Sequence, residues 1–252
     1  MRCLFWLSDR QFELIKPHLP YRSAGRRRED DRRIISGIIH VLQSGCRWRD
    51  CPPEHGPSTT VFNRYKPPVA KRSLAVSVRR SDGGLVGNAG TDIHRRIPRE
   101  SPPLRRRRKR GVSAQAIGPT KGGRNTKVHA ISDEHCRPLA FYLTPGQTAD
   151  ITGAVMLSAS LPNARYLLGD KAYDADHWRG HLKSRRIQPV IPNRSNRKKP
   201  HPFNKVRCKG RNVIERMFGR LKDFRRVVTR YDKNAGNFLA ALCLAALICY
   251  WI

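Results

Sequence analysis

Two acidic residues, Asp170 and Glu215, have neighbours that could position their carboxylates for chemistry. Asp170 ends the segment R-Y-L-L-G-D (165–170), whose short apolar run predicts a buried strand that stops at the acid. An acid in that position projects from the edge of a sheet, where the binding crevices of open α/β sheets lie. Turn residues and helix caps also occur there, so the position alone does not separate a site from a structural role.

Glu215 lies on a predicted helix whose polar side carries both signs of charge. Arg211, Glu215 and Lys222 are spaced i, i+4 and i+11, which puts them within roughly 40° of one another on a helical wheel. The opposite arc, which would pack on a sheet, consists of Val213, Ile214, Met217, Phe218 and Leu221. The polar stripe could also be a solvated row of ion pairs. Asp170 and Glu215 are 45 residues apart, so only tertiary folding can bring them together.

The elements that must position these residues are helical at first and then alternate between strand and helix. Helices are expected at 8–18, 29–44 and 58–65, the first capped by Ser8 and the third by Ser58. They suit a helix-turn-helix DNA-binding unit and a plain helical subdomain equally well. From residue 124 the pattern predicts strands at 126–133 and 138–144, a helix at 151–161, a strand at 165–170, a helix at 175–185, a strand at 189–192 and a helix at 212–222.

The composition points to a polyanionic partner. The formal net charge is +32, from 51 Lys and Arg against 19 Asp and Glu. A surplus of this size favours nucleic acid, with a merely soluble basic protein as the alternative. The seven cysteines show no second Cys/His pair at zinc-finger spacing, which favours reduced thiols. The apolar stretch 238–252 is short for a membrane span and predicts a buried core helix.

The segment R-N-V-I-E-R-M-F-G-R-L-K, which starts at Arg211, resembles the signature of bacterial insertion-sequence transposases of the DDE class. That signature is Tyr, two residues, Arg, three residues, Glu, six residues and Lys. Arg211, Glu215 and Lys222 match it, whereas Cys208 stands at the Tyr position. The segment L-L-G-D-K-A-Y-D (167–174) is similar to the family's second-acid motif. Similar blocks also occur at 121–130, at 143–151 and over the first 65 residues, which resemble the leading domain of the insertion-sequence-five type, a relative of the insertion-sequence-four type.

This resemblance implies an α/β fold, in which a small all-α helix-turn-helix-like domain precedes an RNase H-like catalytic domain. It implies three acids that hold two Mg²⁺ or Mn²⁺ ions, one on the first strand, one at the end of the fourth (Asp170) and one on a late helix (Glu215). Arg211 and Lys222 would hold phosphates near the cut.

The function that the resemblance implies is DNA transposition. The protein would bind terminal inverted repeats and carry out metal-dependent strand cleavage and strand transfer. Its partners would be the double-stranded DNA of the element's ends and of the target, and further copies of itself in a homo-oligomer. It would act in the bacterial cytoplasm, at the nucleoid, with no membrane partner.

Residues 66–110 do not fit this family. They hold fourteen Lys and Arg, three Asp and Glu, and no Asp-Ser-Thr sequence that could supply the first acid. Asp92, in G-T-D-I-H, is a candidate by position alone, because its neighbours differ from that context. Residues 85–97 contain no apolar run suited to a central strand covered on both faces. We therefore expect a damaged first strand and a basic, disordered segment between domains at 1–65 and 111–252.

A change of reading frame would explain this segment. One choice of codons for 102–111, read with one base dropped, gives His-Arg-Ser-Ala-Ala-Ala-Gly-Lys-Gly, similar to the stretch that precedes the family's Gly-Gly-Arg block. The same shift turns 73–80 into the apolar pattern Val-Trp-Gln-Ser-Leu-Phe-Ala. The alternative is a genuine basic, disordered DNA-binding linker. With the frame changed, the chain is expected to be inactive as written, and a non-catalytic DNA-binding remnant or a metal-dependent nuclease are the rival functions.

Overall fold

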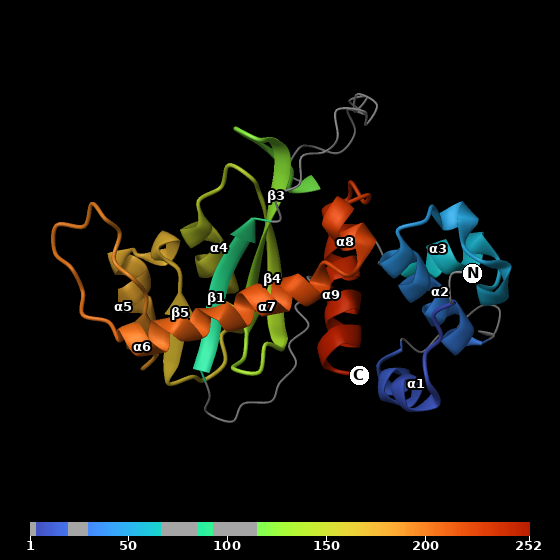
Figure 1. The fold of residues 1–252 in the computed structure, drawn as a ribbon, viewed down its shortest axis with the longest axis horizontal. Helices are drawn as coiled ribbons and strands as arrows, with labels where there is room; N and C mark the ends of the chain where they lie inside the picture. The colour runs from blue at the N-terminus through green and yellow to red at the C-terminus, as the bar shows by residue number, and fades with distance from the viewer. Residues whose placement is uncertain (1–3, 20–29, 67–84, 93–114) are drawn as a thin grey trace.

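A mixed β-sheet forms the centre of the structure (Figure 1). The computed structural model describes residues 4–19, 30–66 and 115–252 in full and the backbone of 85–92. The strands of this part of the chain are β1 (Leu85–Asp92), β2 (Gly118–Thr120), β3 (Gly123–Ser132), β4 (Pro138–Pro145), β5 (Tyr166–Gly169) and β6 (Gln188–Val190). They lie in the order β2-β3-β1-β5-β6, and β4 also pairs with β3.

The strand order confirms the RNase H-like fold. Strand β1 is central, because it pairs antiparallel with β3 and parallel with β5. Strands β3 and β4 form the predicted antiparallel hairpin, and β5 runs parallel to β6. With the short β2 set aside, the first strand thus lies between the second and the fourth, as the resemblance implies.

The expectation that 66–110 is irregular throughout is wrong for residues 85–92, which form β1. Asn88 pairs with Ile131 of β3 on one side and with Gly169 of β5 on the other. Buried backbone N–H and C=O groups of β3 and β5 need partners, and an extended segment can supply them without an apolar run of its own. The hypotheses about 73–80 and 102–111 concern residues outside the described part of the chain.

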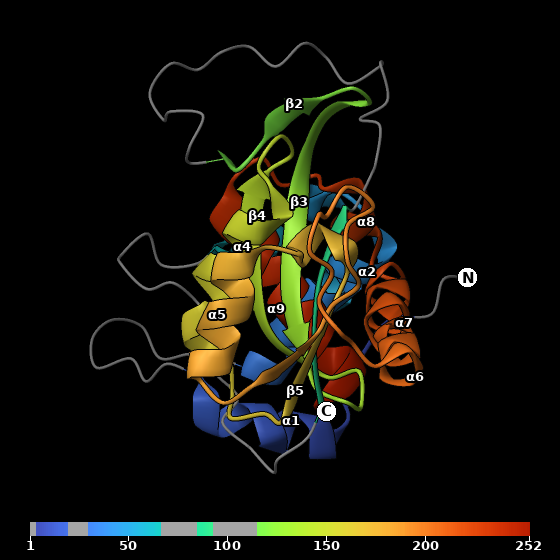
Figure 2. The ribbon, with the colours of Figure 1, turned by 90° about the vertical axis from the view of Figure 1, so that its left-hand side faces the viewer.

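Helices cover both faces of the sheet. On one face lie α4 (Asp150–Leu157) and α5 (Asp176–Ser184), and on the other lie α7 (Asn212–Leu221) and α9 (Ala235–Tyr250) (Figure 2). Side chains of β3 alternate accordingly, since Val128 and Ala130 belong to the core of α7 and α9, whereas Ile131 belongs to the core of α4 and α5. Both faces of the strand are therefore buried.

Helix α9 is the apolar stretch near the C-terminus, and it forms part of the core as predicted. Its buried side chains are Phe238, Ala241, Leu242, Ala245 and Ala246. Within the described residues, every helix is too short or too polar to cross a membrane.

The N-terminal helices are α1 (Asp9–Ile15), α2 (Asp31–Ser44) and α3 (Ser58–Tyr65). Ser8 caps α1 as predicted, in a capping box with Gln11. The prediction that Ser58 caps α3 is wrong, because the carbonyl of Pro57 already accepts hydrogen bonds from Thr60 N and Val61 N. The helix therefore starts after Pro57, and Ser58 is its first residue.

These three helices pack against the C-terminal part of the chain. One apolar core runs from α2 and α3 into α8 (Arg225–Thr229) and α9. The Tyr65 hydroxyl of α3 donates a hydrogen bond of 2.6 Å to the Asn237 carbonyl of α9. Gly45, which ends α2 with φ 73°, lies so close to α8 that a Cβ there would be 2.8 Å from Cβ of Arg225. The N-terminal helices are thus held against α8 and α9 by apolar packing and by the Tyr65–Asn237 hydrogen bond.

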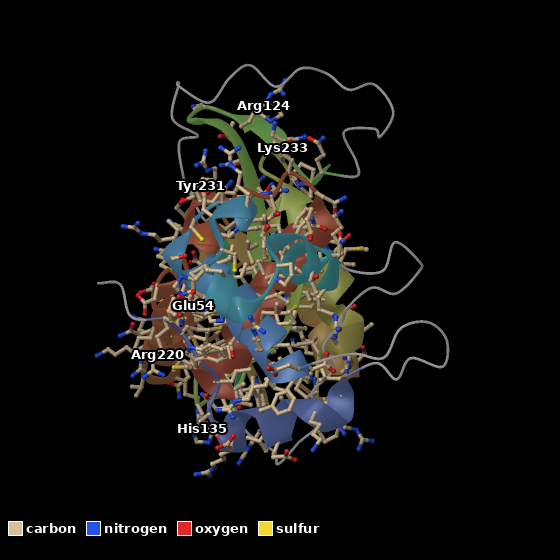
Figure 3. The ribbon with its side chains drawn as sticks, turned by 90° about the vertical axis from the view of Figure 1, so that its right-hand side faces the viewer. Glu54, Arg124, His135, Arg220, Tyr231 and Lys233 are labelled. Atoms are coloured by element: carbon tan, nitrogen blue, oxygen red, sulfur yellow. The ribbon has the colours of Figure 1, made fainter. Side chains whose placement is uncertain are left out.

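Tyr65→Phe is expected to lower the free energy of unfolding by about 1–2 kcal/mol, because the half-buried Asn237 carbonyl loses its donor. Burial and the nearby Asp232 carboxylate raise the pKa of Tyr65 far above its ordinary value, so the hydroxyl stays a neutral donor. Urea denaturation measures the change. Tyr231→Phe is the control, because Tyr231 lies exposed beside the N-terminal helices (Figure 3) and should change stability by less than about 0.5 kcal/mol. Equal effects of the two substitutions would contradict a specific role for Tyr65.

Candidate functional site

Asp170 lies directly after the C-terminal end of β5, as predicted. Its backbone is extended, and its side-chain Oδ1 accepts a hydrogen bond of 2.6 Å from the backbone N–H of Lys171. The side chain is 51% exposed. The strand therefore places an accessible carboxylate at the edge of the sheet.

Arg211 contacts Asp170 across 41 residues of sequence. Its Nη1 lies 2.9 Å from Asp170 Oδ1. Arg211 ends the 3-10 turn η7 (Lys209–Arg211), which follows α6 (Lys205–Cys208) and leads into α7 (Figure 1). The turn η7 also touches β5, since a Cβ at Gly210 would lie 3.1 Å from Leu168 Cδ2. The start of α7 is thereby held at the end of β5.

Glu215 follows Arg211 by four residues, so it lies one turn, or ~6 Å, further along the same side of the helix. Its side chain is exposed, and among the described residues it has no hydrogen bond or ion pair. Lys222, also exposed, is at the C-cap of α7, about 10 Å beyond Glu215. Folding thus brings Arg211 to Asp170, with Glu215 one turn and Lys222 about three turns further along the helix.

Asp92 is at the end of β1, opposite Lys127 of β3. In the parallel pairing of β1 with β5, Asn88 is opposite Gly169, so the position level with Asp170 is Ala89. Asp92 is three residues further on, a backbone separation of about 10 Å along the strand. Within the described residues there is also no group of three His, Cys, Asp or Glu side chains that could hold a metal ion. The candidate donor set is therefore the pair Asp170 and Glu215.

A second acid near β5, Asp174, is buried at the centre of an arginine network that the sequence analysis missed. Its Oδ1 accepts a hydrogen bond of 2.9 Å from Arg179 Nε, and its Oδ2 accepts bonds of 2.7 Å from Arg197 Nε and 2.8 Å from the Arg194 backbone N–H. Burial acts to raise the pKa of this carboxyl, but the hydrogen bonds outweigh it and lower the pKa to about 2. No local pattern could have indicated this network, because the partners are 5, 20 and 23 residues away.

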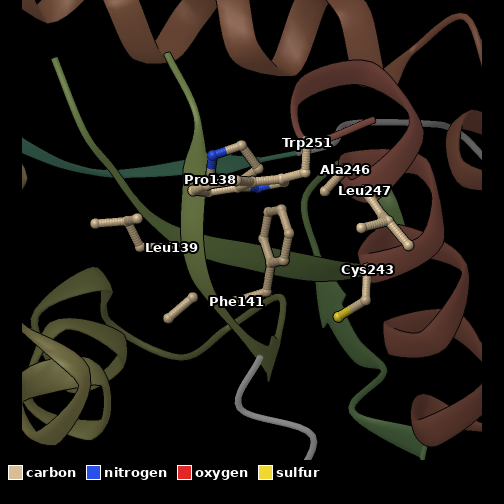
Figure 4. Close-up of a pocket in the computed structure, with 8 residues that line it drawn as sticks. Pro138, Leu139, Phe141, Cys243, Ala246, Leu247 and Trp251 are labelled. Atoms are coloured by element: carbon tan, nitrogen blue, oxygen red, sulfur yellow. The ribbon is translucent and has the colours of Figure 1, made fainter. Parts of the chain in front are cut away.

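An apolar hollow lies between β4 and α9, on a different part of the molecule (Figure 4). Phe141, Cys243, Leu247 and Trp251 contribute to its lining, and its volume is about 30 Å³. Burial raises the pKa of Cys243 to about 12, so its thiol is unreactive. With no acid in its lining and room for little more than a water molecule, this hollow is unsuited to the chemistry of the Asp170 edge.

Two family models match parts of the chain. Residues 103–252 match the family described as "Transposase DDE domain", and residues 7–71 match "Putative transposase of IS4/5 family". Residues 72–102 separate the two matches.

Individual relatives were also found. The chain is 29% identical, over 72% of its length and 94% of the relative's, to "Putative transposase for insertion sequence element IS402" of Burkholderia cepacia. It is 35% identical, over 48% of its length and 93% of the relative's, to the corresponding protein of element IS6501 of Brucella ovis. The catalytic core domain of BIV integrase aligns at 15% identity with a TM-score of 0.38, over 66% of this chain and 82% of that one. The fold assignment rests on the strand order instead.

Asp174→Asn is expected to remove an acid-sensitive part of the stability. A carboxyl whose pKa falls from an ordinary value of about 3.9 to about 2 on folding stabilises the native state above pH ~4 by about 2–3 kcal/mol, and this contribution is lost as the pH falls through ~2. The free energy of unfolding, measured by urea at several pH values, should differ between wild type and variant at pH 7 and converge toward pH 2. Asp223→Asn, at an exposed acid, is the control. A difference for Asp174→Asn that stays constant down to pH 2 would contradict the arginine network.

Proposed function

The chain belongs to the DDE transposase family of bacterial insertion sequences, and on that premise we propose that Asp170 and Glu215 are two acids of its DNA-cleaving centre. DNA cleavage and transfer is the general function of this family. The observation that carries the proposal is the Asp170–Arg211 ion pair, because it joins the end of β5 to the start of α7. Glu215 then follows one helical turn from the pair.

Asp170 and Glu215 suit a divalent cation such as Mg²⁺ or Mn²⁺. Mg²⁺ sites in enzymes that act on phosphates commonly use one or two carboxylates together with substrate oxygens. Both acids are exposed and can reach an incoming DNA strand. A cation held there supplies activation of the attacking oxygen and stabilisation of the leaving one. Arg211 and Lys171 N both donate to Asp170 Oδ1, so the guanidinium competes with a cation for this carboxylate.

Arg211 and Lys222 are proposed to hold backbone phosphates once DNA is bound. Arg211, released from Asp170, presents a planar fork that matches phosphate oxygens. Lys222, further along α7, offers a point charge to the next part of the strand. The stripe of α7 would thus track the DNA backbone on both sides of Glu215.

The N-terminal helices are proposed to bind the terminal inverted repeats or to support assembly of a homo-oligomer on paired DNA ends. Thr59, Thr60 and Asn63 form an exposed polar side of α3, while Val61 and Tyr65 face the core. Polar side chains on an exposed helix are the groups that read base edges and phosphates. The +32 net charge supports DNA as the partner, with location at the nucleoid following from it.

A non-catalytic DNA-binding remnant is the second candidate, and the register of β1 favours it. Ala89, which lies level with Asp170, cannot provide a third ligand, and Asp92 is three residues away along the strand. Two cations that share three carboxylates would be poorly held by two. We therefore propose that the chain as written cleaves DNA weakly at most, and we leave Asp92 out of the site.

Arg211→Ala is expected to tighten Mn²⁺ binding about fivefold, because it removes a positive charge and a competitor from a half-exposed carboxylate. Asp170→Asn and Glu215→Gln should each weaken it by tenfold or more, by loss of a ligand charge. Electron paramagnetic resonance of free Mn²⁺ gives the affinities. Arg207→Ala is the matched control, because Arg207 stacks 4.1 Å from the Tyr166 ring and should leave the affinity unchanged. Weaker Mn²⁺ binding in Arg211→Ala would reject the proposed site.

Restoring the reading frame across 66–110 is expected to raise Mg²⁺-dependent cleavage of end-repeat DNA by about 10³-fold, or ~4 kcal/mol of transition-state stabilisation. Asp92→Asn in the chain as written should leave the residual cleavage unchanged. Gel analysis of labelled duplex measures both, and joined products distinguish transposition from simple nuclease activity. Equal cleavage by the chain as written and the frame-restored chain would refute both the loss of the first acid and the frameshift. A gene whose codons for 66–110 cannot encode the shifted sequences given above would also refute the frameshift.

A further inference from the structure

A basic loop, residues 193–201, lies between β6 and α6 at the end of the molecule away from the N-terminal helices (Figure 1). It contains four Lys and Arg and no acid. Asn193 closes the loop, because its Nδ2 donates to the His201 carbonyl at 2.9 Å and its Oδ1 accepts from the His201 N–H at 3.0 Å. A loop whose ends are bonded in this way is a compact unit rather than a free linker.

Asp174 fixes this loop to the body of the protein. Its carboxylate, fully buried, holds the Arg194 backbone and the Arg197 side chain on one oxygen. The Arg179 side chain binds the other oxygen and also donates to the carbonyl of Ile191, two residues before the loop, at 2.8 Å. Asp174 therefore sets the position of the first half of the loop.

The loop is also bonded to the backbone next to the catalytic candidate Asp170. The Arg194 side chain donates to the Lys171 carbonyl at 3.2 Å and to the Ala172 carbonyl at 2.7 Å. Lys171 in turn donates its N–H to Asp170 Oδ1. Movement of the loop would thus disturb the turn that orients Asp170.

Asp176 provides a second, exposed attachment. Its Oδ1 accepts a bond of 2.8 Å from Arg197 Nη1 and lies 2.8 Å from His201 Nε2. Asp174 and Asp176 thus both bind Arg197, in the middle of the loop. Asp176 also contacts His201, at the C-terminal end of the loop. The pKa of Asp176 is lowered by these hydrogen bonds, so its carboxylate is ionised at neutral pH.

Two lysines of the loop take no part in these attachments. Lys198 and Lys199 are exposed, and neither has an ion pair among the described residues. Together with Asp174, Asp176 and Arg197 they line a hollow of about 440 Å³. Unpaired ammonium groups on an ordered loop can bind phosphate oxygens without first giving up a carboxylate partner, and without paying the full entropy of ordering the loop.

We propose that Asp174 is a positioning residue that, with Asp176, fixes residues 193–201 as a binding site for DNA-backbone phosphates beside Asp170. The proposal rests on the proposed function for its choice of DNA as the polyanion. Lys198 and Lys199 supply the phosphate contacts, and Asp174 and Asp176 hold the loop in one conformation. Phosphate contacts of this kind set the register of the DNA on the protein without reading its bases.

Lys198→Ala/Lys199→Ala tests the phosphate contacts. Binding to a fluorescent 30-base-pair duplex of arbitrary sequence is measured by anisotropy across a salt series in EDTA. The slope of log affinity against log salt should become less negative by about 1.8, since each phosphate contact contributes ~0.9 for B-DNA. Lys121→Ala/Lys183→Ala removes two exposed lysines elsewhere, one between β2 and β3 and one on α5. An unchanged slope in the loop variant, or an equal change in the control, would overturn the proposal.

Asp176→Ala and Asp174→Asn test the positioning role, because a purely electrostatic effect and a loss of loop order change the DNA affinity in opposite directions. If only charge mattered, removing an acid from a basic surface would tighten DNA binding. A positioning role predicts binding weakened about three- to tenfold, with faster hydrogen exchange at the Arg194 amide, whose N–H bonds to Asp174. Asp176 is 74% exposed, so its variant should fold even if Asp174→Asn does not. Tighter DNA binding by Asp176→Ala would overturn the proposal.

Failure of this proposal and failure of the proposed function give different results. Asp170→Asn tests the metal site by itself, because its Mn²⁺ affinity should fall whether or not the loop binds phosphates. Normal binding by the loop variants would remove the loop site and leave the pair Asp170 and Glu215 standing. Altered binding by the loop variants, in a protein whose Asp170→Asn form binds Mn²⁺ normally, would support the loop and reject the metal site.

Discussion

The position of Asp170 depends on the pairing of β5 with β1. Strand β5 is only four residues long, and β1 is the neighbour that joins it to the rest of the sheet. Yet β1 contains Gly87 and Gly90, and glycine within a strand costs roughly 0.5–1 kcal/mol relative to alanine. The position of Asp170 thus depends on β1, a strand whose sequence is poorly suited to a central place in the sheet. A change in residues 85–92 would therefore affect the site.

The charge of Asp170 at the edge of the sheet is balanced by Arg211. Arg211 satisfies Asp170, and a half-exposed ion pair of this kind contributes little to stability, typically ~0–1 kcal/mol. Its value lies in geometry, because it joins β5 to the helical run that carries Glu215. The buried Asp174 network is the stronger support, since removing a partner from a buried ion pair leaves an uncompensated charge. The Asp170–Arg211 ion pair is therefore weak and exchangeable, whereas the neighbouring buried network of Asp174 is rigid.

The elements with strong local patterns could be predicted from the sequence, and those set by distant partners could not. The hairpin β3–β4, the strand before Asp170 and the amphipathic helix of Glu215 follow from apolar periodicity and turn residues. Strand β1 did not, because its place follows from backbone pairing with β3 and β5 rather than from an apolar pattern in its own sequence. The contact of Arg211 with Asp170 and the network of Asp174 likewise arise only when distant segments meet.

A structure determined with Mn²⁺, located by its anomalous scattering, tests the central claim most directly. The account predicts a Mn²⁺ ion bound by carboxylate oxygens of Asp170 and Glu215, at about 2.0–2.3 Å, with the Arg211 guanidinium moved off Asp170. A crystal in which Mn²⁺ binds elsewhere, while Arg211 stays paired with Asp170 and Glu215 remains in solvent, would contradict it.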